Sequence, residues 1–196
     1  MFVKICGLSS AEQVQAAVDA GADAVGFVFA DSVRRIDPAD AAAISNTVPD
    51  TIKKVAVMLH PSNEEWEVVL GAFRPDVLQT DAGDFPGLNV PGNIECWPVF
   101  REGNKVTDTL LSRFVYEGPK SGQGETVDWA QAATVARRGN MILAGGLSAS
   151  NVGEAIATVR PFGVDVSSAV ESAPGEKDPD MIREFISAAR AAESEL

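Results

Sequence analysis

The sequence contains few of the residues that bind metals or form disulfides. Its 196 residues include two cysteines, Cys6 and Cys96, and one histidine, His60. The cysteines show no metal-type spacing, so neither a disulfide framework nor a zinc site is expected. The histidine precedes Pro61 in a predicted turn, where it is interpreted as a structural or rim residue without a chemical role.

Positive charge is also scarce. The chain has 16 lysines and arginines against 28 aspartates and glutamates, which gives a net charge of −12. Nucleic acids and anionic membranes favour basic surfaces, so neither is an expected partner. An anionic small molecule is compatible with this charge, since glycine turns and single arginines bind anions locally. No long apolar run marks a membrane span or a secretory leader, which favours the cytoplasm.

Short apolar runs alternate with segments of helical spacing along the chain. Because 45% of the residues are hydrophobic, residues 1–196 can bury one sizeable core and are expected to form a single domain. Eight strand signals with helical or shortened connections favour an α/β fold, the closed (β/α)8 or TIM barrel, over an open sheet. The expected strands are residues 4–7, 24–29, 54–58, 76–79, 95–100, 113–116, 141–144 and 164–166.

Helices are expected between most of these strands. The predicted segments are residues 11–20, 38–48, 62–73, 106–111, 129–138, 151–159 and 180–192. Residues 81–93 are rich in glycine, proline and aspartate, so the helix after the fourth strand is expected to be shortened or missing. This economy fits a chain that is short for eight βα units.

Two pairs of small residues end the last two predicted strands. Gly145 and Gly146 follow the seventh strand, and Ser167 and Ser168 follow the eighth. Parallel strands bring their carboxyl ends to one edge, where ligands bind, and in (β/α)8 barrels the last two turns often hold phosphate. The four residues therefore either form a phosphate cradle or only close a turn and cap one.

The first strand carries a candidate base. Side chains alternate along a strand, so Lys4 and Cys6 share its inward face, and Cys6 lies at the carboxyl end near the barrel mouth. A nearby cation favours a thiolate, so Cys6 is either a thiolate base above a buried ammonium or a small buried side chain. Asp165 faces inward with Ser167 and is expected to meet a ligand or a buried donor, because an unpaired carboxylate there is costly.

Two further candidates lie in predicted loops. Asp128 ends the loop after the sixth strand, where it caps the helix that begins at Trp129, acts as a general acid, or does both. Arg34 lies beside Arg35 after the second strand. There it either clamps a carboxylate with its paired donors or stays solvated.

Together these motifs resemble the phosphoribosylanthranilate isomerase family over nearly the whole chain. The likeness covers residues 4–7 (KICG), 21–29 (GADAVGFVF), 32–34 (SVR), 121–124 (SGQG) with 128–129 (DW), 143–147 (LAGGL) and 163–168 (GVDVSS). The KICG and SGQG with DW segments are particular to this family, whereas the last two also look like other phosphosugar barrels. The ordered set is therefore more specific than any single motif.

The resemblance implies an isomerase of tryptophan biosynthesis that needs no metal or organic cofactor. Such an enzyme converts N-(5-phosphoribosyl)anthranilate into 1-(2-carboxyphenylamino)-1-deoxyribulose 5-phosphate by an Amadori rearrangement. By family pattern Asp128 matches the general acid, Cys6 the base and Arg34 the residue that holds the anthranilate carboxylate. The phosphorylated aminosugar is the expected partner, with no protein partner evident. A substrate-facing aspartate and a phosphate cradle match Asp165, Gly145, Gly146, Ser167 and Ser168.

Four positions depart from the family pattern. Asp81 stands where a histidine is frequent, which would leave this carboxylate in solvent. The other three are a valine for a frequent proline, a glutamate for a common lysine or glutamine, and an alanine for a usual glycine, at Val33, Glu125 and Ala169. None of these changes removes the candidate acid or base.

Two other functions stay open on the residues alone. One is a different phosphosugar isomerase, epimerase or lyase on the same cradle, although Lys4 lies one layer too deep for the lysine of a common lyase plan. The other is a degenerate barrel that binds a phosphosugar and catalyses nothing. The presence of both Cys6 and Asp128 argues against the second alternative.

Overall fold

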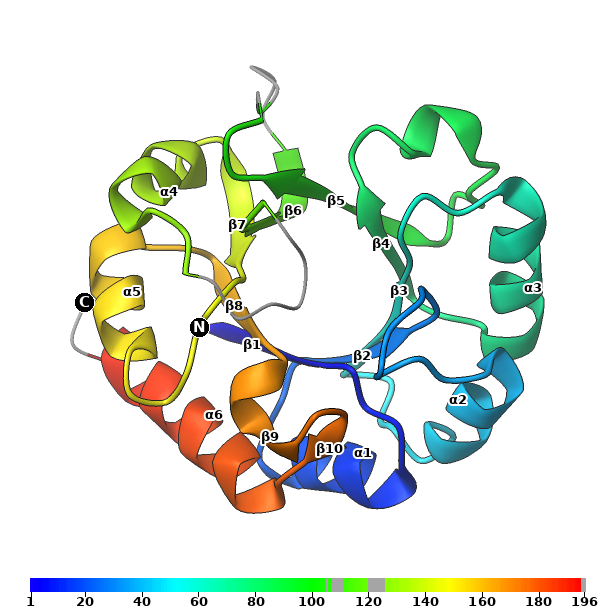
Figure 1. The fold of residues 1–196 in the computed structure, drawn as a ribbon, viewed down its shortest axis with the longest axis horizontal. Helices are drawn as coiled ribbons and strands as arrows, with labels where there is room; N and C mark the ends of the chain where they lie inside the picture. The colour runs from blue at the N-terminus through cyan, green and yellow to red at the C-terminus, as the bar shows by residue number, and fades with distance from the viewer. Residues whose placement is uncertain (105, 107–110, 120–125, 195–196) are drawn as a thin grey trace.

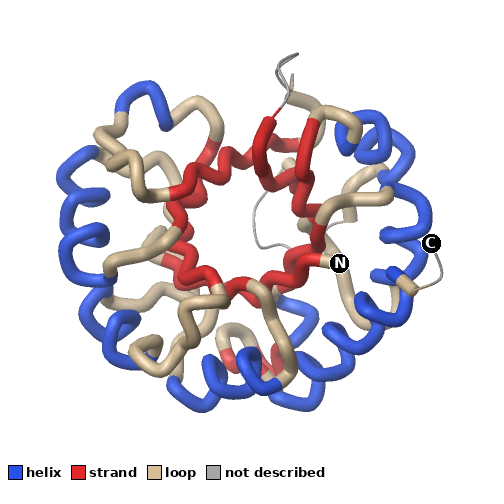
Figure 2. The backbone as a smooth tube through the Cα atoms, turned by 180° about the vertical axis from the view of Figure 1, so that it is seen from behind, coloured by secondary structure: helices blue, strands red, loops and turns tan. Residues whose placement is uncertain are grey.

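The computed structural model describes residues 1–104, 106, 111–119 and 126–194, and its centre is a closed barrel of eight parallel strands. Each strand pairs with its neighbours in chain order, and β8 closes the ring onto β1. Figure 2 shows this ring of strands inside a layer of helices. The predicted (β/α)8 barrel is therefore confirmed. Its strands are Phe2–Cys6, Ala24–Val28, Lys53–Val57, Val77–Asp81, Glu95–Arg101, Leu111–Glu117, Gly139–Leu143 and Gly163–Val166, β1 to β8.

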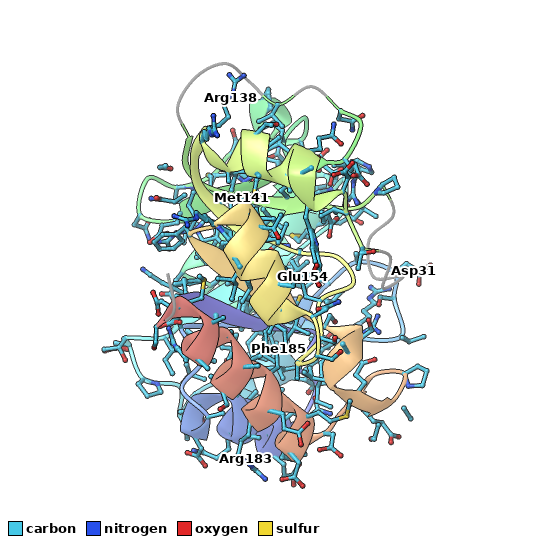
Figure 3. The ribbon with its side chains drawn as sticks, turned by 90° about the vertical axis from the view of Figure 1, so that its left-hand side faces the viewer. Asp31, Arg138, Met141, Glu154, Arg183 and Phe185 are labelled. Carbon is cyan, nitrogen blue, oxygen red and sulfur yellow. The ribbon has the colours of Figure 1, made fainter. Side chains whose placement is uncertain are left out.

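Six α-helices cover the outside of the barrel in the part of the chain that is described. Most of them begin at a side chain that accepts a bond from a free backbone N–H, as polar helix caps do. Figure 3 shows α5 and α6 side by side on this outer layer. The helices are Ala11–Asp19, Pro38–Ile44, Asn63–Phe73, Trp129–Ala136, Val152–Val159 and Pro179–Glu193, α1 to α6.

The connection after β4 contains only one turn of 3-10 helix, η1 at Phe85–Gly87. Its proline, and the glycines and aspartates around it, disfavour a longer helix, so the predicted shortening is confirmed. The helix predicted over residues 106–111 falls mostly outside the described residues. Leu111 itself begins β6, two residues before the predicted start of that strand.

Two apolar cores lie on opposite sides of the strands. The larger one lies between strands and helices, and includes Phe27, Trp66 and Phe185. The smaller one fills the barrel with side chains such as Val55, Trp97 and Ile142. This division follows from the alternation of side chains along each strand. The barrel interior also admits polar groups near its carboxyl end, and these contribute to the site.

Two short strands after β8 were not predicted. β9, Glu171–Ala173, pairs antiparallel with β10, Glu176–Lys177, and Gly175 between them has a φ of 85°. The 3-10 turn η2, Ser168–Val170, leads from β8 into this hairpin. In Figure 1 the hairpin lies between the end of β8 and the start of α6. No helix in the described ranges combines the length and the hydropathy that crossing a membrane requires.

Candidate active site

A pocket opens at the carboxyl ends of the strands. It contains seven of the eight residues predicted for the site, and these come from loops and strand ends far apart in the sequence. Asp31 of the loop after β2 also lines it and projects from the edge where the β9–β10 hairpin lies (Figure 3). The predicted residues that line the pocket are Cys6, Arg34, Gly145, Gly146, Asp165, Ser167 and Ser168.

The floor of the pocket contains a buried ion pair beside Cys6. Lys4 is fully buried, and its Nζ donates to Asp165 Oδ1 at 3.0 Å, so the donor expected for Asp165 is present. Gly26 of the neighbouring strand makes room for this group. A Cβ at Gly26 would lie 3.1 Å from Cys6 Sγ and 3.2 Å from Lys4 Nζ. Lys4 and Cys6 therefore share the inward face, as predicted.

Burial has the largest effect on the pKa of Cys6. It raises the pKa of the thiol, and the nearby charge of Lys4 lowers it by less. Burial likewise raises the pKa of Asp165 against the opposing effect of Lys4. Burial lowers the pKa of Lys4, but Asp165 and Cys6 raise it by more. Burial thus outweighs the charge of Lys4 at the Cys6 thiol, and the thiolate at Cys6 stays a prediction.

Arg34 is held by a carboxylate of the protein. Its Nε donates to Glu171 Oε1 at 2.6 Å and its Nη2 to Glu171 Oε2 at 2.8 Å. The hydrogen bond to Glu171 raises the pKa of Arg34. Gly7 permits this placement, because a Cβ there would lie 2.7 Å from Arg34 Cδ, and its φ of 80° suits glycine. The arginine therefore lies next to Cys6, with one edge of its guanidinium already occupied.

Lys177 completes this cluster. It pairs with Glu171 Oε1, and its Nζ also donates to the Ser167 carbonyl at 3.0 Å. Burial raises the pKa of Glu171, but Arg34 and Lys177 lower it by more, to about 2. Burial lowers the pKa of Lys177 against the opposing effect of Glu171. Sequence reasoning missed Glu171 and Lys177, although opposite charges flanking a Pro-Gly turn are a signal of cross-strand pairing.

The glycine and serine turns lie together on one wall of the pocket. Gly145 and Gly146 have φ values of 92° and 61°. Asn151 steadies this turn, because its Nδ2 donates to the Gly146 carbonyl at 2.9 Å. On the adjacent strand the Ser167 hydroxyl donates to the Cys6 carbonyl at 3.1 Å. Backbone groups at positive φ and nearby hydroxyls suit an anion, and the phosphate cradle stays a prediction.

The opposite wall contains a second ionic cluster. Arg101 donates to both carboxylate oxygens of Asp81, at 3.0 and 2.6 Å, and to Glu117 Oε1 at 2.6 Å. Asp81 does not stay in solvent, because β4 continues to this residue and Arg101 ends the adjacent strand. His60 lies at the rim with its Nδ1 2.9 Å from Asp84 Oδ1, and this bond raises its pKa.

Asp128 is the predicted site residue that does not line the pocket. It caps α4, where its Oδ1 accepts from the N–H groups of Ala130 and Gln131 at 2.8 and 3.0 Å. Its own N–H donates to Glu102 Oε1 at 2.7 Å. The capping role is therefore confirmed, and the general-acid role stays a prediction. The SGQG motif at residues 121–124 and Glu125 lie outside the described residues.

The fold and the position of the pocket together define the class of protein. Eight parallel strands form a filled barrel, and polar side chains from different strand ends converge on one pocket at their carboxyl ends. Enzymes of the (β/α)8-barrel fold place their active sites at this end.

The chain belongs to the N-(5'-phosphoribosyl)anthranilate (PRA) isomerase family, whose family model matches residues 3–188. The isomerase of Listeria welshimeri is 38% identical over 205 residues, which cover 98% of this chain and 100% of that protein. The Thermus thermophilus isomerase structure has a TM-score of 0.84 at 29% identity, with 97% and 99% of the two chains covered. An isomerase structure in complex with reduced 1-(o-carboxyphenylamino)-1-deoxyribulose 5-phosphate has a TM-score of 0.79 at 29% identity, again covering 97% and 99%.

Proposed function

We propose that this chain catalyses the Amadori rearrangement of N-(5-phosphoribosyl)anthranilate to 1-(2-carboxyphenylamino)-1-deoxyribulose 5-phosphate in tryptophan biosynthesis. Its membership of the isomerase family supports the proposal. The single structural observation that carries it is one pocket that unites Cys6, Arg34 and the two small-residue turns. A thiol base, a carboxylate clamp and an anion cradle then face one substrate. One domain over residues 1–196, working in the cytoplasm, is part of the proposal.

The two anionic ends of the substrate are assigned to opposite sides of Cys6. Arg34 holds the anthranilate carboxylate through paired charge-assisted hydrogen bonds. The phosphate lies against backbone and hydroxyl groups of Gly145, Gly146, Ser167 and Ser168, which line the same pocket. Fixing both ends places the ribose between them, so that C2 lies over the floor of the barrel.

Proton transfer then needs one acid and one base. Asp128 protonates the ring oxygen as the C1–O bond breaks, which opens the furanose to an iminium ion. Cys6 removes the proton from C2, and the electron pair of that C–H bond neutralises the iminium. The resulting enol tautomerises to the ketose product. Because a cation lowers the pKa of a neighbouring thiol, the iminium favours ionisation of Cys6 at the step that needs it.

A fluorescence assay tests this function. Phosphoribosylanthranilate is generated in situ, the purified chain is added, and the decay of substrate emission is followed beside Asp128→Asn and Cys6→Ser variants. We expect each substitution to lower turnover by orders of magnitude, roughly 10²-fold or more, while circular dichroism shows the fold intact. Near wild-type rates in both variants would overturn the assigned acid and base. No decay with the folded wild type would overturn the proposed substrate.

A further inference from the structure

Arg34 presents only one of its two paired-donor edges to the pocket. A guanidinium offers one edge through Nε and an Nη, and another through its two Nη atoms. Glu171 occupies the first edge through bonds of 2.6 and 2.8 Å. Within the described ranges Nη1 of Arg34 has no protein partner. A substrate carboxylate must therefore approach the edge formed by Nη1 and Nη2.

Glu171, the partner of Arg34, has a buried side chain and is paired with both Arg34 and Lys177. The side chains of Arg34 and Glu171 are 12% and 4% exposed, so protein encloses most of both side chains. The stem of Arg34 lies over Gly7, where a larger residue would collide with its Cδ at 2.7 Å. A long side chain that is fixed before binding loses less conformational entropy when the ligand arrives. Glu171 thus preorganises Arg34.

Lys177 offsets the negative charge that Glu171 places beside Arg34. A lone Glu171 would neutralise Arg34 and repel an incoming carboxylate. Lys177 pairs with Glu171, so the three side chains together keep one positive charge. Lys177 also donates to the carbonyl of Ser167 at 3.0 Å, which connects the cluster to the turn assigned to phosphate.

We propose that Glu171, backed by Lys177, is a positioning residue that makes the site selective for an aminosugar phosphate with an aromatic carboxylate. It acts through Arg34 and touches no reacting atom. The β9–β10 hairpin, which connects η2 to α6, carries both members of the pair. The proposal rests on the proposed function, because it takes the ligand of Arg34 to be the anthranilate carboxylate.

Binding of two stable product analogues separates this role from a merely structural one. The first is reduced 1-(o-carboxyphenylamino)-1-deoxyribulose 5-phosphate, and the second is the phenylamino compound, which lacks only the carboxylate. Titration calorimetry gives the ratio of their Kd values. We expect Glu171→Gln to reduce the preference for the carboxylate by about tenfold or more, whereas a structural defect weakens both ligands alike.

Two controls test whether Glu171 acts on carboxylate binding through Arg34. Glu176→Gln changes an exposed glutamate of the same hairpin and is expected to leave the Kd ratio unchanged. Arg34→Ala is expected to remove the preference, and adding Glu171→Gln to it changes the ratio no further, because both residues act on one contact. Glu171→Asp keeps the charge beside Lys177 but shortens the reach to Arg34. It replaces Glu171→Gln if that variant does not fold, with a smaller loss in the same direction.

Each outcome has one meaning. Failure of both analogues to bind the wild type contradicts the proposed function. Equal Kd values in the wild type contradict the carboxylate clamp at Arg34. A wild type that discriminates, with Glu171 variants that discriminate equally well or better, overturns the positioning role while leaving the function in place.

Discussion

At the scale of single residues, Cys6 lies between opposing electrostatic effects. Burial and the charge of Asp165 raise the pKa of its thiol, while Lys4 and Lys177 lower it. Burial is the largest of these effects, so the pKa of the thiol lies above its ordinary value. The sequence indicates the position of Lys4 under Cys6 but not how completely the site is buried from water. The sign of the pKa shift at Cys6 depends on that burial.

Alkylation of Cys6 is expected to follow this raised pKa. The Cys96→Ser variant leaves Cys6 as the only thiol, and its reaction rate with iodoacetamide is measured against pH. Thiolate is the reacting form, so the rate rises with pH. Its midpoint should lie above 9.0, the ordinary pKa of a thiol. A midpoint below 9.0 would mean that the charge of Lys4 outweighs burial and that the sequence-based thiolate was the better description.

Much of the pocket could be predicted residue by residue. Period-two alternation places Lys4, Cys6 and Asp165 inside the barrel, and the Lys4–Asp165 contact of 3.0 Å confirms it. Glu171 and Lys177 could not be assigned, because their strands contain three and two residues, too few to show a periodicity. Their role becomes visible only when the turn of the hairpin brings them beside Arg34.

At the scale of elements, the start of α4 combines a structural and a proposed catalytic role in Asp128. Asparagine caps a helix about as well as aspartate but cannot donate a proton as an acid. The free energy of unfolding of Asp128→Asn should therefore lie within a few tenths of a kcal/mol of the wild-type value. That of Asp128→Ala should be lower by about 1 kcal/mol, because its cap is missing. Both should lose turnover alike. Thermal unfolding and initial rates are measured together, and a fast Asp128→Asn enzyme would assign Asp128 to the cap alone.

Strand ends were harder to predict than strands. The sequence places the end of β4 at Gln79, but the strand continues to Asp81. Those extra residues bring Asp81 beside Arg101, because β4 and β5 run in register up to the pair Asp81 and Val99. The ion pair thus depends on pairing between strands, which a single sequence does not reveal.

At the scale of the whole molecule, the two ends of the barrel serve different purposes. The carboxyl end contains the pocket and its ionic clusters. At the amino end Arg113 lies between three aromatic rings, with its guanidinium carbon 4.9 Å from the centre of Phe2, 5.2 Å from Trp97 and 4.8 Å from Phe162. This contact connects β1, β5, β6 and the residue before β8, so it ties these strands together at the end of the barrel away from the pocket. In (β/α)8 barrels that end contributes to stability.

Substitution of Arg113 tests whether the amino end contributes to stability and not to catalysis. Arg113→Ala removes both the cation over the rings and the packing of its stem, and should lower the free energy of unfolding in urea by about 2 kcal/mol. Arg113→Met retains the stem without the charge, so it should recover part of that loss. The remaining difference from the wild type is the contribution of the charge, which acts on the rings and on Glu95, whose Oε2 lies 3.5 Å from Arg113 Nη1. Neither variant should change kcat/KM at a temperature where all three proteins are folded. A fall in kcat/KM under those conditions would mean that closure of the amino end positions the residues of the pocket, and the two ends of the barrel would then not be independent.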